Sequence, residues 1–208
     1  MANLKFSEFT EQTDPANVAF VVGYDGATNV RIDPANIGGG GGAGLFEVNA
    51  TGGSQSTQRI GSGNATGGFA TVSGGTVCTA SGYRAVVGGG YDNTASGYDS
   101  VSSGGYENES TGRRAFVGGG GNNIASGEAS SVAGGYRNTA SQARAFVGGG
   151  FNNSSIGNST FVGGGDGNTA SGQFSSLVGG KTNTVSKNYS FVGGGFSNNC
   201  QGYYSVIA

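Results

Sequence analysis

The stretch Ala85-Val-Val-Gly-Gly-Gly-Tyr-Asp-Asn-Thr-Ala-Ser-Gly-Tyr-Asp99 is one copy of a repeat that continues to Ala208. Pairs of glycines mark nine copies and begin at Gly74, Gly89, Gly104, Gly119, Gly134, Gly149, Gly164, Gly179 and Gly194. The step is fifteen residues each time, without insertion or deletion. A fixed period means that each copy is one unit stacked on the last, because an extra residue would shift its neighbours out of register. The repeat therefore predicts an all-β fold, a β-solenoid with one parallel coil per copy.

Aligned copies form columns, and two of these columns predict a thin interior. The column at Val87 is apolar in almost every coil, and small residues such as Ala85 and Ala115 precede it by two positions. Residues two apart on a strand share one face of the sheet. A further column of small residues is expected to be buried and also accepts Cys200: Ala80, Ala95, Ala125, Ala140 and Ala170.

The column between these two points the other way and is also largely apolar. It contains Phe116, Phe146, Phe161 and Phe191 and is interrupted by serine at position 131 and again at 176. A coil of fifteen residues can bury only one face by itself, and each phenylalanine would gain roughly 1.5–3 kcal/mol by burial. A contiguous apolar stripe in water is unusual. We therefore expect these phenylalanines to pack against other copies of the chain, in a parallel homotrimer around a common axis.

A column of asparagines is the strictest feature of the repeat and is broken only by Cys78. Its members are Asn93, Asn108, Asn123, Asn138, Asn153, Asn168, Asn183 and Asn198. Asparagine tolerates positive φ and bonds its own backbone at turns, and stacked amides can bond to one another. The paired glycines, and a later glycine column at Gly82 and Gly97, are expected to supply turn conformations that side chains forbid.

The N-terminal part differs in composition and divides the chain into three regions. Residues 1–36 are expected to contain a hairpin in which Val18–Tyr24 and Thr28–Ile32 pair across Asp25-Gly26. Because a lone hairpin is marginal in water, we expect this region to be an attachment module that docks on a larger partner. Residues 37–54 hold a glycine-rich linker and a short strand at Leu45–Val48. Residues 55–208 hold the coils, of which the first is degenerate and starts near Gln55.

Composition excludes several functional classes. The 208 residues include no histidine and no tryptophan, so Cys/His zinc sites and Ser/His/Asp triads are absent. Carboxylates such as Asp92, Glu107 and Asp166 are scattered over different coils, and no phosphate-binding loop is complete. With 11% charged residues and a net charge of -2, no nucleic-acid surface is indicated. No segment approaches the ~18 apolar residues of a membrane span. We expect no enzyme activity, cofactor or metal.

The start of the chain carries no secretory signal pattern, which favours synthesis and folding in a cytosol. Cys78 and Cys200 agree with this, because they lie about eight coils apart and cannot reach each other within one chain. We expect two free thiols, mostly buried.

Columns that vary from coil to coil are expected outside. They include exposed aromatic residues that are candidates for binding a surface: Tyr91, Tyr106, Tyr136 and Phe151. Packing of these rings on a rim or between chains is an equally good explanation. A further alternative is an ice-binding solenoid, which needs a flat Thr-x-Thr array. Thr79, Thr94, Thr139, Thr169 and Thr184 form only a broken single column.

The coil Ser131-Val-Ala-Gly-Gly-Tyr-Arg-Asn-Thr-Ala-Ser141 resembles the head repeats of trimeric autotransporter adhesins of the YadA type. The resemblance covers residues 55–208 and implies a trimeric, left-handed parallel β-roll. Asn3-Leu-Lys-Phe-Ser-Glu-Phe-Thr, Ala19-Phe-Val-Val-Gly-Tyr-Asp-Gly and Asn29-Val-Arg-Ile look like the start of YadA-domain structural proteins of marine tailed phages.

These resemblances imply a virion fibre or appendage, assembled in the host cytoplasm. Residues 1–36 would bind other virion proteins, and the stiff β-roll would project towards a host-surface molecule. A bacterial cell-surface adhesin is the alternative that the same repeats imply.

Overall fold

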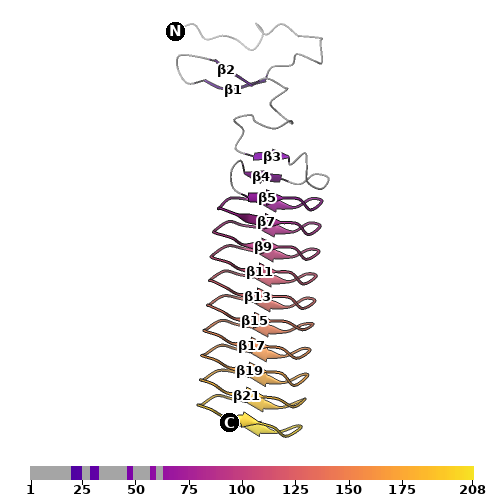
Figure 1. The fold of residues 1–208 in the computed structure, drawn as a ribbon, viewed down its shortest axis with the longest axis vertical. Coiled ribbons are helices and arrows are strands. Elements are labelled where there is room, and N and C mark those ends of the chain that lie inside the picture. Colours follow the sequence, from indigo (N-terminus) through magenta and orange to yellow (C-terminus); the bar gives the residue numbers. More distant parts are fainter. Residues whose placement is uncertain (1–19, 25–28, 33–45, 49–56, 60–62) are drawn as a thin grey trace.

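The chain is a parallel β-solenoid of about ten stacked coils, each about fifteen residues long, as the repeat predicts (Figure 1). The computed structural model describes the backbone of residues 20–24, 29–32, 46–48 and 57–59, and the backbone and side chains of residues 63–208. All regular elements in these ranges are strands, without a helix. The left-handed winding and the trimer stay predictions.

Two sheets run the length of the rod, and each coil contributes one short strand to each sheet. We call the twelve-stranded one the Phe sheet. Its strands are β3 (Phe46–Val48), β4 (Thr57–Arg59), β6 (Thr71–Val72), β8 (Val86–Val87), β10 (Val101–Ser102), β12 (Phe116–Val117), β14 (Ser131–Val132), β16 (Phe146–Val147), β18 (Phe161–Val162), β20 (Ser176–Leu177), β22 (Phe191–Val192) and β24 (Val206–Ile207).

We call the ten-stranded one the Thr sheet. Its strands are β5 (Gly63–Ala65), β7 (Cys78–Ala80), β9 (Thr94–Ala95), β11 (Glu109–Ser110), β13 (Ile124–Ala125), β15 (Thr139–Ala140), β17 (Ser154–Ser155), β19 (Thr169–Ala170), β21 (Thr184–Val185) and β23 (Asn199–Cys200). From β6 onward, each strand pairs in parallel with the strand of the next coil in the same sheet, and each residue lies opposite the one fifteen positions later. Val101 lies opposite Phe116, and Thr94 lies opposite Glu109.

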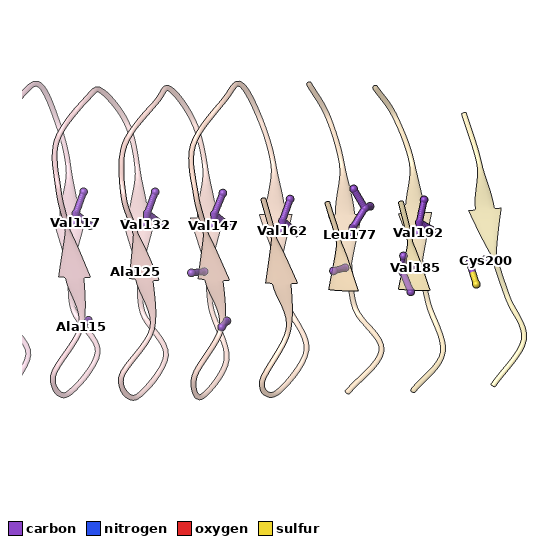
Figure 2. Packing of buried hydrophobic residues seen from close by; sticks show 13 residues of the cluster. Ala115, Val117, Ala125, Val132, Val147, Val162, Leu177, Val185, Val192 and Cys200 are labelled. Carbon is purple, nitrogen blue, oxygen red and sulfur yellow. The ribbon is translucent and has the colours of Figure 1, made fainter. Parts of the chain in front are cut away.

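The core is a single layer of small and branched side chains between the two sheets. Val117, Val132, Val147 and Val162 point inward from the Phe sheet in one straight column (Figure 2). Ala125 faces them from the Thr sheet and is fully buried. Short side chains on both sheets let the two backbones approach closely. The valine column at Val87 and the small-residue column at Ala85, both predicted from the repeat to lie inside, are buried and thus confirmed.

Ser102 is an exception inside this core and leads to a first prediction. It occupies the valine column, is fully buried, and its hydroxyl has no hydrogen-bond partner. A buried polar group without a partner costs about 1–3 kcal/mol. We expect Ser102→Val to raise the free energy of unfolding by about 1–3 kcal/mol in urea denaturation, because it removes the hydroxyl and adds apolar volume. Ser102→Ala, which removes only the hydroxyl, should give a smaller gain. A loss of stability with Ser102→Val would mean that the hydroxyl is satisfied.

Strands outside the repeat agree with the expected hairpin and add a cap that the sequence did not indicate. β1 (Phe20–Tyr24) and β2 (Asn29–Ile32) pair antiparallel, whereas Asp25-Gly26 and the glycine linker lie outside the described residues. β3 pairs antiparallel with β4, and β4 pairs in parallel with β6. β3 therefore covers the open backbone edge of the first coil, which would otherwise invite pairing with another chain.

Candidate self-association surface

The asparagine column is a buried hydrogen-bond ladder that ties each coil to the next. Asn138 is fully buried, and its Oδ1 accepts a hydrogen bond from the backbone N–H of Asn153 at 2.9 Å. Its Nδ2 donates to the carbonyl oxygens of Gly134 and Gly150, each at 3.0 Å. The same pattern connects the coils from Asn93 to Asn183. The column is therefore structural and is not open to a ligand.

The structure confirms one expectation about this column in part and corrects another. The amides bond mainly to the backbone; direct amide–amide bonds join only two neighbouring pairs, as between Asn153 and Asn138 at 3.2 Å. Asparagine also does not take the left-handed conformation here. Positive φ occurs one residue earlier, as at Asp92 with φ +52°, and at the other turn, as at Arg84 with φ +53°. The asparagine is needed for its three hydrogen bonds, and the left-handed turn is made by its neighbour.

Cys78 shows what the ladder requires. Its thiol occupies the asparagine position, is buried and forms no disulfide bond. The sulfur lies 3.6 Å from the carbonyl oxygen of Gly90. It can donate one of the bonds that an amide would make, but it offers only a weak acceptor. Cys200 is likewise free and buried, in the small-residue column where it was expected.

The outer face of the Phe sheet carries no charged residue from β6 onward. Two side-chain columns point outward from it, one before and one after the buried valine of each coil. The first column is Thr71, Val86, Val101, Phe116, Ser131, Phe146, Phe161, Ser176, Phe191 and Val206, and the second is Ser73, Gly88, Ser103, Gly118, Ala133, Gly148, Gly163, Val178, Gly193 and Ala208. We call these the Phe column and the Gly column. Neither contains a charged residue.

The predicted trimer-face residues lie on this surface and remain accessible in the single chain. Phe116, Phe161 and Phe191 are 39%, 40% and 38% exposed, and Phe146 is half-buried. The rings of Phe146 and Phe161 stack at 5.4 Å between centroids. The face is therefore a largely apolar stripe, interrupted by Ser131 and Ser176, that this part of the chain does not cover itself.

The two outward columns vary together in side-chain size. All four phenylalanines stand two residues before a glycine, and both Ser131 and Ser176 stand two residues before a larger residue, alanine or valine. A Cβ on Gly118 would lie 2.3 Å from the backbone oxygen of Ala133 in the next coil, so the backbone alone requires glycine there. The same Cβ would also lie 3.2 Å from Cε1 of Phe116. The equivalent distance at Gly163 is 3.3 Å. Each ring thus lies against the glycine of its own strand, and the face stays low in relief.

The turn after the Gly column carries the four candidate surface aromatics, and all of them are exposed. Tyr91 stacks on Tyr106 at 5.3 Å, and Tyr136 stacks on Phe151 at 6.0 Å. Gly121 separates the two pairs. The rings lie along the edge of the rod, outside the Phe-sheet face, where a partner could contact them.

Charged residues gather at the opposite turn. Arg84 makes two hydrogen bonds to the carboxylate of Asp99, at 2.6 and 2.7 Å, and its guanidinium also lies over the rings of Tyr83 and Tyr98. The hydrogen bond from Arg84 holds the pKa of Asp99 below its ordinary value. Arg114 lowers the pKa of Glu128 in the same way two coils further on. These ion pairs are exposed at the edge of the rod and contribute little to the free energy of unfolding.

A shallow depression of about 240 Å³ lies on the rod beside the aromatic turn. Asp92, Thr94, Glu107, Glu109, Asn122 and Ile124 line it. A hydrogen bond to Glu107 raises the pKa of Tyr106 next to it. No group of three or more His, Cys, Asp or Glu among the described residues is arranged to hold a metal ion. The depression is an open hydrogen-bonding surface.

The outer face of the Thr sheet carries the threonine column considered for ice binding. Serine follows two residues after each of Thr79, Thr94 and Thr139, so hydroxyls form two columns. Glu109 and Ile124 interrupt the threonine column in the middle of the rod. The face is therefore not the unbroken flat array that ice binding needs.

Comparison with models of known protein families and with curated proteins finds no match to this chain. No helix in the described ranges is long and apolar enough to cross a membrane.

Proposed function

We propose that this chain is a structural protein without enzymatic activity, which forms a homotrimeric fibre or appendage of a virion. Three parallel copies pack their Phe-sheet outer faces around a common axis. The observation that carries the proposal is the uncharged apolar stripe of that face, in which three of the four phenylalanines are more than a third exposed. A stripe of this kind marks an interaction site, because soluble monomers rarely leave one in water.

A second copy of the chain is the occupant that fits this face best. The stripe repeats at every coil, so its relief has the ~4.8 Å spacing of parallel strands along the whole rod. A partner that follows it must carry the same spacing over the same length, and another copy of this solenoid does. Neither outward column bears a charge, so copies meet without repulsion.

The remaining parts of the proposal follow from the resemblances in the sequence. Residues 1–36 attach the fibre to other virion proteins, and the rod projects as a stiff spacer towards a host cell. Exposed Tyr91, Tyr106, Tyr136 and Phe151 are candidates for host contact, since stacked rings offer apolar area with a polar edge. A trimeric adhesin on a bacterial surface would use the same rod and the same edges. Immunoelectron microscopy with an antibody to the coils separates the two, by labelling virions or cell surfaces.

The first test is the solution mass of the chain. We expect sedimentation equilibrium to give three times the 20.4 kDa of one chain. The double variant Phe146→Ser, Phe161→Ser should shift the equilibrium towards monomer by at least tenfold in the dissociation constant, because each phenylalanine gains roughly 1.5–3 kcal/mol by burial. The matched control is Phe174→Ser, Tyr189→Ser, which removes a similarly exposed stacked pair from a turn.

The control should leave the mass at that of the trimer. A well-folded monomer at all concentrations would refute the fibre proposal, because the Phe-sheet face would then be stable in water. If the variant at Phe146 and Phe161 remains trimeric and the control variant dissociates, the contact between chains lies at the turn and not on the Phe-sheet face.

A further inference from the structure

One coil of the rod has a polar interior. Its three inward positions are Ser100, Ser102 and Ser110, where the coils before and after it carry alanine, valine and alanine. All three serines are fully buried, and we call them the Ser layer. The buried hydrophobic residues of the described coils form two separate clusters, one from Ala65 to Ala95 and one from Ala115 to Cys200. The Ser layer lies between these two clusters.

The hydroxyls of the Ser layer do little to replace the missing apolar packing. Those of Ser100 and Ser102 have no hydrogen-bond partner, and that of Ser110 donates to the carbonyl of Thr94 at 3.3 Å. By contrast, the interior serine at position 130 donates to a carbonyl at 2.8 Å, and its coil keeps valine in the valine column. Because buried polar groups without partners are costly, the contact between the coils on either side of the Ser layer is weakened.

Like charges on the surface coincide with this layer. Asp92, Glu107 and Glu109 line one shallow depression over the same coils, and Asp92 precedes Glu107 by one coil in the same column. None of the three makes an ion pair with a residue that the structure describes, whereas every other acidic side chain of residues 63–208 does. Neighbouring like charges on a sheet repel each other, which weakens the rod at the same height.

We propose that the Ser layer divides the rod into two units that unfold separately, and that the unit on its N-terminal side opens first. Backbone pairing of β10 with β8 and β12 continues through the layer, so the rod is weakened there without being interrupted. In a stack where each coil contacts only its neighbours, a weak interface lets one side open while the other stays folded.

Two features make the N-terminal unit the weaker one. It holds fewer of the described coils, and each coil contributes its own packing and one interface to the total stability. It also carries Cys78 where the ladder otherwise has asparagine. The inference concerns the core of one chain and does not rest on the proposed fibre. In a fibre attached through residues 1–36, the coils nearest the attachment in sequence would open first.

Hydrogen exchange of the full chain, read by mass spectrometry at rising urea concentrations below the unfolding midpoint, tests the division. We expect the hydrogen-bonded amides of residues 71–95 to exchange together, about tenfold faster or more than those of residues 116–192, with a step at the Ser layer. The repair variant Ser100→Ala, Ser102→Val, Ser110→Ala gives the layer the residues of its neighbours. It should slow exchange of residues 71–95 by about tenfold or more and remove the step.

The matched control is Ser175→Ala, which removes a buried hydroxyl without a partner from the C-terminal cluster. At the same protein concentration, it should leave the exchange of residues 71–95 unchanged. A smooth rise in exchange rate towards the N-terminal coils would mean ordinary fraying and would overturn the inference. Equal rates on both sides of the layer, or a step that persists in the repair variant, would overturn it as well.

Discussion

Asn138→Ala should lower the free energy of unfolding by about 3 kcal/mol or more, the largest effect that we expect from a single side chain here. The substitution removes three hydrogen bonds that involve two successive coils. It leaves the buried N–H of Asn153 and the half-buried carbonyl of Gly134 without these partners, whereas the carbonyl of Gly150 keeps the N–H of Tyr136. Each typical bond contributes about 0.5–1.5 kcal/mol, and each buried group left unpaired costs about 1–3 kcal/mol. Urea unfolding at fixed protein concentration gives the change.

Two variants show whether the loss comes from the ladder. Asn198→Ala acts on a half-buried residue of the last coils, whose Nδ2 donates only to Gly194, so it should cost about 1 kcal/mol. Thr139→Ala changes the outward neighbour of Asn138 and should stay within about 0.5 kcal/mol of the native chain. Equal losses at positions 138 and 198 would contradict the ladder as the source of stability.

Much of the fold could be predicted from the repeat alone, because a solenoid converts sequence period directly into contacts. The fifteen-residue step fixes which residues pair, and the apolar and small columns fix which side chains are buried. Val117 and Ala125 were assigned to the core on this basis, and both are buried. The outward direction of Phe116 and Phe161 followed from alternation along the strand.

Other features could not be predicted, because they depend on backbone geometry within a turn. The left-handed residue precedes the asparagine, at positions as different as Asp92, Glu107 and Arg137, so no residue type marks it. The antiparallel pairing of β3 with β4 could not be predicted, because it depends on where the first coil lies in space. The fit of Phe116 against Gly118 appears only when the ring is placed. In the sequence, its sole signal is that the Gly column has a larger residue at the two coils where the Phe column has serine.

The glycine column at the second turn is also explained differently by the structure than by the sequence. These residues were expected to supply turn conformations that a side chain forbids. Gly97 and Gly112 lack the positive φ of a residue such as Gly90, at +90°. A Cβ on Gly112 would instead lie 2.0 Å from the carbonyl oxygen of Gly127 in the next coil. Glycine is needed there because the two backbones touch.

Gln142 and Lys187 show how a coil accommodates a side chain in this column. The backbone N–H of Gly112 donates to the carbonyl of Ala125 at 3.2 Å, and other glycines of the column do the same. In the described coils, the N–H groups of Gln142 and Lys187 make no such bond. The N–H of Gly157 makes no such bond either, so the turn can forgo this inter-coil hydrogen bond, and both side chains stand where it is absent.

Gly112→Ala should therefore cost about 2–3 kcal/mol in urea unfolding, the sum of a lost hydrogen bond and the strain of displacing the turn. Gly134→Ala is the matched control, because a Cβ there meets no atom within 4 Å and φ is not positive. That variant should be neutral, or stabilising by about 0.4–1 kcal/mol through the unfolded chain. If both variants lose stability alike, glycine is required for flexibility; if only Gly112→Ala does, the close contact between successive coils sets the requirement.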